Sequence, residues 1–96
     1  MSFDIAAQFG DNLVRVRKQA GLSQDETSVR ASVHRTEISQ LERGLRIPRI
    51  DTLVKLAASL EASPAELLTG IAWEPGGTVY GSFSTPDAAL AQRKGI

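Results

Sequence analysis

A run of polar side chains between residues 35 and 43 has the chemistry needed to contact double-stranded DNA. Ile38 and Leu41 are three residues apart, so both fall on one face of a helix and turn that face inward. The outward set contains Arg, Thr, Ser and Gln and no acid, and such side chains suit base edges and phosphates. The pattern is typical of a recognition helix with outward residues Arg35, Thr36, Ser39, Gln40 and Arg43.

Residues 22–44 contain two short helical patterns that position this run, separated by a break of three or four residues. The first begins at Ser23, whose hydroxyl can accept from an amide of the first turn, while Glu26 can accept from the amide of Ser23. The second stops at Gly44, because glycine most easily adopts the left-handed conformation that follows a helix. We therefore expect two helices joined by a tight turn.

The turn itself departs from the usual chemistry at Ser32. A tight turn normally needs one residue with positive φ, usually glycine, and serine at this place costs about 1 kcal/mol. Thr27 faces inward where leucine would pack better, so we expect a weak spot there. Ser28 is small and lets the second helix approach closely.

The composition indicates one small globular domain. The chain has 96 residues and 42% hydrophobic content, which is enough for a modest core. It has no cysteine, which excludes disulfides and thiolate metal sites and fits a reducing cytoplasm. The sequence shows neither an apolar run that could cross a bilayer nor the pattern of a signal peptide. We expect a cytoplasmic protein with no membrane partner.

The net charge of zero argues against nucleic-acid binding, but the distribution of charge argues for it. Residues 30–49 carry five Arg against Glu37 and Glu42, a local charge of +3. Screening confines fields to roughly 10 Å in ordinary salt, so the local charge matters more than the sum. The positive charge gathers at the proposed recognition helix and the loop after it.

The remaining apolar pattern predicts three more helices. One runs from about Asp4 to Ala20 and another from about Ile50 to Glu61. The last starts at Ser63-Pro64-Ala65-Glu66, a cap followed by Pro at the first position and Glu at the third, and ends near Gly70. Five helices with short connections predict an all-α bundle over residues 1–70. The expected core includes Phe9, Leu13, Val16, Ala20, Leu53, Leu56, Ala57, Leu60, Leu67 and Leu68.

Residues 71–96 form a C-terminal extension with a different pattern. Apolar residues alternate from Thr78 to Phe83, as in a short strand. A lone strand is not stable, so it must pair, and its copy in a second subunit is the economical partner. Residues 86–91 are expected to form one or two frayed helical turns, and residues 93–96 to be disordered.

An ordered series of residues over 9–70 is more specific to one protein family than any one of these patterns. It consists of Arg17-Lys18, Gly21-Leu22-Ser23-Gln24, Val33, Ile38, Leu41-Glu42-Arg43-Gly44, Pro48, Leu53, Leu56-Ala57, Leu60 and Ser63-Pro64-Ala65-Glu66-Leu67-Leu68. In this spacing it resembles the Xre-type helix-turn-helix family, the lambda-repressor-like (Cro/C1) DNA-binding domains of phage repressors and small bacterial regulators. The resemblance implies a five-helix, lambda-repressor-like DNA-binding domain. The chain departs from the family pattern at Thr27, Ser32, His34 and Arg49.

The resemblance also implies a role for each polar residue of the expected surface. The residues at base-reading positions are Arg35, Thr36, Ser39 and Gln40. The residues at phosphate-contacting positions are Ser23, Gln24, His34, Arg43, Arg46 and Arg49. A structural ion pair between the first and third helices is implied for Arg17 and Glu42.

The residues alone leave alternatives open at three of these positions. Arg46 and Arg49 could equally be solvated loop charges. His34 is the only histidine and has no second ligand at helical spacing, so a phosphate or turn role is favoured over a metal.

One such domain contacts too few base pairs for useful specificity, and the family usually works as a two-fold dimer on a palindrome. The apolar side chains after Gly70 are too many to hide in so small a core. We expect residues 78–83 to pair with their symmetry mate, and the rival is a tail that folds back on its own last two helices. The expected dimer contact consists of Trp73, Val79, Tyr80 and Phe83.

Two classes of function follow from these expectations. The first is a sequence-specific regulator of transcription, a repressor that binds a palindromic operator in double-stranded DNA as a homodimer. The alternative is an antitoxin or protein-docking module of a toxin–antitoxin or restriction-control system, with a toxin as partner. An enzyme is not expected, because the chain has no Cys, one His and no paired acids in a predictable cleft. We expect no cofactor and no metal, and a location in the cytoplasm at the nucleoid.

Overall fold

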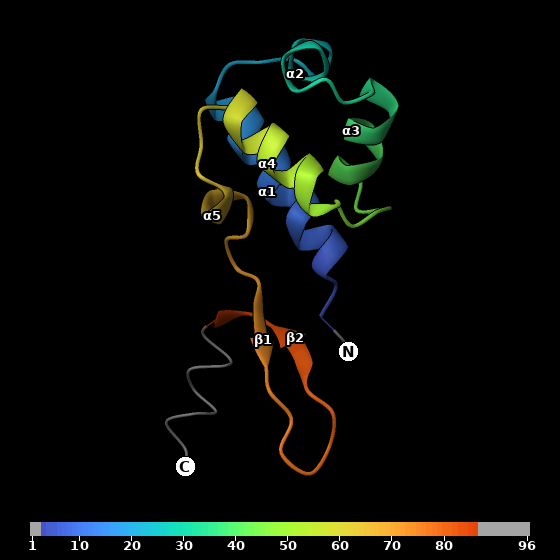
Figure 1. Ribbon diagram of the computed structural model, residues 1–96, viewed down its shortest axis with the longest axis vertical. Coiled ribbons are helices and arrows are strands. Elements are labelled where there is room, and N and C mark those ends of the chain that lie inside the picture. The colour runs from blue at the N-terminus through green and yellow to red at the C-terminus, as the bar shows by residue number, and fades with distance from the viewer. Residues whose placement is uncertain (1–2, 87–96) are drawn as a thin grey trace.

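Five helices pack around one core, and a two-stranded hairpin extends from the bundle in the computed structural model of the chain (Figure 1). The structure describes residues 3–86. The elements are α1 (Ile5–Gln19), α2 (Gln24–Ala31), α3 (Arg35–Glu42), α4 (Ile50–Ser59), α5 (Pro64–Leu67), β1 (Ala72–Glu74) and β2 (Ser82–Ser84). The predicted five-helix domain with a short extension is confirmed, although most helices end slightly earlier than expected and α5 is a single turn.

Two helices begin with the reciprocal cap that their sequences predict. The Ser23 hydroxyl accepts from the Glu26 N–H at 3.0 Å, and Glu26 Oε1 accepts from the Ser23 N–H at 2.9 Å. At the start of α5, Glu66 Oε2 accepts from the Ser63 N–H at 2.8 Å. These bonds satisfy amides that have no partner inside the helix.

The turn between α2 and α3 has the predicted strain at Ser32, whose φ is 53°. The Ser28 hydroxyl supports the turn by donating to the carbonyl of Val33 at 2.6 Å. Thr27 is fully buried, and its hydroxyl donates to the carbonyl of Ser23 at 2.9 Å. The inward threonine is therefore hydrogen-bonded, which removes the larger cost of an unpaired buried hydroxyl.

The core takes apolar side chains from every helix. Two expected members are wrong: Ala20 is exposed because it caps the end of α1, and Leu68 is 42% exposed because α5 has already ended. Leu53 is only partly buried. The buried apolar side chains are Phe9, Leu13, Val16, Ala31, Val33, Ile38, Leu41, Leu56, Ala57, Leu60 and Leu67.

Gly10 lets the end of α3 pack directly on α1. A Cβ at this position would lie 2.6 Å from the carbonyl oxygen of Leu41 and 2.7 Å from that of Glu42. Both atoms belong to backbone and cannot rotate away, so only glycine permits this approach. The contact fixes where the C-terminal end of α3 lies.

Asn12 joins α1 to the end of α5 from a fully buried position. Its Nδ2 donates to the carbonyl of Leu67 at 3.0 Å and to that of Thr69 at 2.7 Å. Its Oδ1 accepts from Gln8 Nε2 and from Arg15 Nη1, both at 3.1 Å. The sequence alone does not predict this role for Asn12, because the carbonyls that it binds are more than 50 positions away.

The hairpin corrects the expectation for the extension. Of the strand expected over residues 78–83, only residues 82 and 83 belong to β2, which pairs antiparallel with β1 of the same chain. Trp73 lies opposite Phe83, with ring centroids 5.0 Å apart at 74°. Residues 75–81 form the connection, and a Cβ at Gly76 would lie 1.8 Å from the carbonyl oxygen of Val79.

The apolar alternation extends only from Thr78 to Phe83, so the sequence did not predict β1 as the partner strand. The frayed turns and disordered end expected over residues 86–96 lie outside the described residues from position 87 onward. In Figure 1 the hairpin lies at the end of the molecule remote from α2.

Candidate nucleic-acid interface

The outward face of α3 and the start of α2 form one continuous surface. Arg35, Thr36 and Arg43 are exposed, whereas Ser39 and Gln40 are half-buried. A shallow hollow of about 210 Å³ brings four of the predicted contact residues of α3 together with the first residue of α2. Its lining consists of Gln24, Arg35, Thr36, Ser39 and Arg43.

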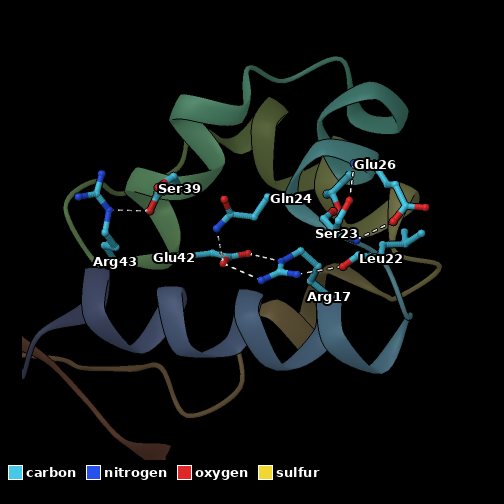
Figure 2. Close-up of polar contacts among 9 residues, drawn as sticks. Arg17, Leu22, Ser23, Gln24, Glu26, Ser39, Glu42 and Arg43 are labelled. Atoms are coloured by element: carbon cyan, nitrogen blue, oxygen red, sulfur yellow. Dashed lines mark hydrogen bonds and ion pairs between the residues drawn. The ribbon is translucent and has the colours of Figure 1, made fainter.

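An ion pair between Arg17 and Glu42 lies directly behind this surface (Figure 2). Arg17 Nε lies 2.5 Å from Glu42 Oε2, and Arg17 Nη2 lies 3.0 Å from Glu42 Oε1. Arg17 Nη1 also donates to the carbonyl of Leu22 at 2.9 Å. The side chains of the pair are 13% and 6% exposed. The hydrogen bonds that Arg17 donates to Glu42 raise the pKa of its guanidinium above the ordinary value.

Gln24 is the third member of this network. Its Nε2 donates to Glu42 Oε1 at 2.9 Å, as Figure 2 shows. The first residue of α2 is therefore joined to the last residue of α3 through the carboxylate that also binds α1. The expected phosphate contact of Gln24 has to use the other hydrogen of its amide or its backbone N–H, because one amide hydrogen is engaged.

The exposed arginines near α3 all have partners within the protein. Arg43 Nε donates to the carbonyl of Ser39 at 3.3 Å (Figure 2), and Arg46 Nη1 donates to Gln40 Oε1 at 3.2 Å. Two more form exposed ion pairs with aspartates at 3.3 Å. These pairs are Arg35–Asp25 and Arg49–Asp51.

The ion pair between Asp25 of α2 and Arg35 of α3 was not predicted from the sequence. The sequence analysis found no acid in the outward set of α3, because Asp25 belongs to the preceding helix. Asp25 Oδ1 lies 3.3 Å from Arg35 Nε, with side chains 73% and 64% exposed respectively. The outward surface of α3 therefore has one carboxylate beside its first arginine.

The other acidic and titratable residues near α3 have different environments. Glu37 of α3 is half-buried. His34 is exposed at the N-cap of α3 and makes no side-chain cap hydrogen bond. Within residues 3–86 no group of three or more His, Cys, Asp and Glu side chains is placed to hold a metal ion. No helix in that part of the chain is long and apolar enough to span a membrane.

The residues expected at the dimer contact lie on the hairpin. Trp73 is 50% exposed, Phe83 42%, Val79 76% and Tyr80 101%. Trp73 and Phe83 pack against each other in register, and the other two lie on the connection between the strands. The hairpin and its connection, residues 72–84, contain one charged residue, Glu74, and no cation.

A family described as Helix-turn-helix (HTH_3) matches residues 13–67. The uncharacterized HTH-type transcriptional regulator y4dJ of Sinorhizobium fredii (strain NBRC 101917 / NGR234) is 39% identical over 75 residues, which cover 78% of this chain and 97% of that protein.

Two solved structures are similar to the helical bundle. The restriction-modification controller protein C.AhdI from Aeromonas hydrophila has a TM-score of 0.65 and 31% identity, covering 68% of this chain and 98% of that chain. SinR, a master regulator for biofilm formation solved in complex with DNA, has a TM-score of 0.60 and 34% identity, covering 62% of this chain and 97% of that chain. The family match ends at Leu67, before β1 begins.

Proposed function

This chain belongs to the helix-turn-helix (HTH_3) family and is a DNA-binding regulator of transcription, and we propose that the outward face of α3 reads a palindromic operator. The observation that carries the proposal is the network of Arg17, Gln24 and Glu42, which holds the start of α2 and the end of α3 in one fixed relation. A recognition helix must be held rigidly, because small misplacements lose hydrogen bonds to base edges.

The base contacts follow from the side chains that α3 presents. Arg35 can donate two hydrogen bonds to guanine, and Gln40 can both donate to and accept from adenine. Thr36 and Ser39 have short side chains whose hydroxyl groups can either donate a hydrogen bond to a base edge or accept one from it. Gln40 Oε1 accepts from Arg46 Nη1 in the free protein at an exposed position.

The phosphate contacts surround the recognition helix. At the start of α2 the Ser23 N–H is bound to Glu26, so Ser23 offers its hydroxyl, while Gln24 offers its backbone N–H at the positive end of the helix dipole. The remaining contacts come from the N-cap of α3, its C-terminal end and the loop before α4. These are His34, Arg43, Arg46 and Arg49.

We further propose a homodimer formed through the hairpin. A two-stranded sheet with three residues in each strand is too small to be stable alone, and its aromatic pair is half exposed. The absence of any cation over residues 72–84 does not suit DNA, whereas Trp73, Val79, Tyr80 and Phe83 suit an apolar contact. A second copy supplies the two-fold symmetry that a palindrome needs.

Repression is the mode of action that we propose, because a dimer seated on an operator blocks other proteins from that DNA. The alternative of a restriction-control system is favoured by the likeness to the controller protein C.AhdI. The alternative of a toxin partner would place that partner on the same apolar hairpin. We propose that the protein acts in the cytoplasm, at the chromosome, without catalysis.

Selection of bound sequences from random duplex DNA tests this function. We expect a two-fold symmetric motif, with binding that weakens steeply as salt increases. Binding without any preference among sequences would contradict base reading by α3. A motif without two-fold symmetry would contradict the palindrome while leaving DNA binding intact.

A further inference from the structure

Asp25 places a carboxylate on the proposed DNA-binding surface, where a negative charge does not favour contact with phosphates. Its Oδ1 lies 3.3 Å from Arg35 Nε, and the side chains of the two residues are 73% and 64% exposed. An ion pair this exposed contributes little to folding stability, because solvent screens it. A negative charge close to the phosphates also opposes binding. Beyond its favourable place in the first turn of α2, its benefit is to be sought in the choice among DNA sequences.

The geometry of the pair leaves the useful edge of Arg35 open. A guanidinium has five N–H donors, and Asp25 faces the one on Nε. Within the part of the chain that the structure describes, no other acid lies within ion-pair distance of Arg35. The Nη1 and Nη2 groups can therefore donate together to O6 and N7 of one guanine.

The charge of Asp25 separates the two kinds of acceptor that compete for Arg35. A phosphate carries a full negative charge, so the neighbouring carboxylate repels it and also neutralises the arginine that would attract it. A guanine edge is uncharged, so the same carboxylate affects that contact less. Asp25 thus lowers the affinity of Arg35 for phosphate more than its affinity for guanine.

We propose that Asp25 is a specificity-determining residue, which holds Arg35 through Nε for end-on contact with guanine and opposes its capture by the DNA backbone. This inference rests on the proposed base reading by Arg35. It assigns a DNA-recognition role to a residue of α2 that contacts no base itself.

The chain contains a matched control for this idea. Asp51 is also the second residue of its helix, and its Oδ1 also lies 3.3 Å from an exposed arginine, Arg49. Arg49 is proposed to hold phosphate and reads no base. Removing the charge of Asp51 should therefore strengthen binding to all sequences alike.

The experiment compares D25N, D51N, R35A and the double variant D25N/R35A with the unchanged chain. Each is measured against the duplex that the unchanged chain selects from random DNA and against a scrambled duplex, at several salt concentrations. The ratio of the two affinities is the specificity. We expect D25N to bind the scrambled duplex about 3- to 10-fold more tightly, to lose about 5-fold or more in specificity, and to relax the guanine position that R35A relaxes. D51N should keep its specificity within about twofold.

Three results would overturn the inference. The first is a D25N variant that strengthens both duplexes equally, as D51N does. The second is a double variant D25N/R35A that loses as much specificity relative to R35A as D25N loses relative to the unchanged chain. The effect of Asp25 would then not depend on Arg35. The third is an R35A variant with unchanged sequence preference, which removes the base-reading role of Arg35 itself and so identifies a failure of the proposed function.

Discussion

Gln24 Nε2 donates to Glu42 Oε1 at 2.9 Å, and this bond joins the first residue of α2 to the last residue of α3. Because Glu42 also receives Arg17 from α1, three helices meet at one carboxylate. The recognition surface is therefore held from behind by charge-assisted hydrogen bonds, which are stronger than neutral ones. Replacing Glu42 tests the fold and the orientation of α3 together.

Glu42→Ala should lower the free energy of unfolding by up to about 3 kcal/mol, because it leaves the mostly buried Arg17 without its partner. The matched variant is Glu37→Ala on the same helix, whose carboxylate is half-buried and forms no ion pair among residues 3–86. Urea unfolding of both variants measures the difference. Equal losses would show that the ion pair contributes no more to stability than an unpaired acid on the same helix.

Base reading by α3 predicts different effects for neighbouring side chains. Arg35→Ala or Gln40→Ala should cost about 1–3 kcal/mol on the selected duplex and relax the choice at one or two base pairs. Arg46→Ala should weaken all duplexes and reduce the salt slope by about one unit. An unchanged ranking of sites in Gln40→Ala would contradict the placement of the recognition helix.

Gly10→Ala should destabilise the fold, although alanine is the better helix former. The added Cβ would meet the carbonyl oxygen of Leu41 at 2.6 Å, so α3 must move away from α1 at a cost of about 1–3 kcal/mol. The control is Gly77→Ala, where a Cβ meets nothing within 4 Å. Thermal unfolding should show a clear loss for the first variant and almost none for the second. A Gly10→Ala protein as stable as the unchanged chain would show that the contact is not tight.

The cap of α2 predicts a small dependence of stability on acid. The backbone N–H of Ser23, followed by its hydroxyl, holds the pKa of the Glu26 carboxyl below its ordinary value. A carboxyl whose pKa is lower in the folded state stabilises the fold above its unfolded-state pKa of about 4.3, and this contribution disappears as pH falls through the folded-state value. Glu26→Gln keeps the cap and removes the titration.

Unfolding curves between about pH 6 and 2 check this prediction. The loss of stability on acidification should be smaller in Glu26→Gln than in the unchanged chain. Glu61→Gln is the control, because Glu61 is exposed and its carboxylate accepts no cap hydrogen bond among residues 3–86. An identical loss of stability on acidification in all three proteins would contradict a role for the Glu26 charge in the cap.

Local chemistry predicted most of the helical bundle. The cap of Ser23 and Glu26, the strained Ser32 and the inward Ile38 each follow from residues a few positions apart. What the sequence did not predict depends on distant partners. Asn12 binds carbonyls more than 50 positions away, and the fit of Gly10 depends on the backbone of α3.

Dependence on distant partners also explains the two surface contacts that the sequence did not predict. Asp25 reaches Arg35 only because the turn folds α2 beside α3, so a search of one helix face could not find it. Trp73 was separated from the strand pattern by Pro75-Gly76-Gly77, although these residues form the connection of a hairpin. In both cases the missing information was which neighbour a side chain would meet.

The hairpin dimer predicts that the oligomeric state depends on residues after Gly70. The chain truncated after Gly70 keeps all five helices and almost all of the buried core, so it should fold. Sedimentation should show the full chain as a dimer and the truncated chain as a monomer. Operator binding by the monomer should be far weaker, because a two-fold site then requires two separate binding events.

A second variant separates the apolar contact from the hairpin's own folding. Val79→Ser with Tyr80→Ser changes only the exposed connection and leaves the ring contact of Trp73 with Phe83 in place. It should weaken the dimer, whereas Val29→Ser, at an apolar side chain 81% exposed on α2, should not. If the truncated chain dimerised at the same concentration as the full chain, the contact would lie on the helical bundle. The apolar hairpin would then be left for a different protein partner.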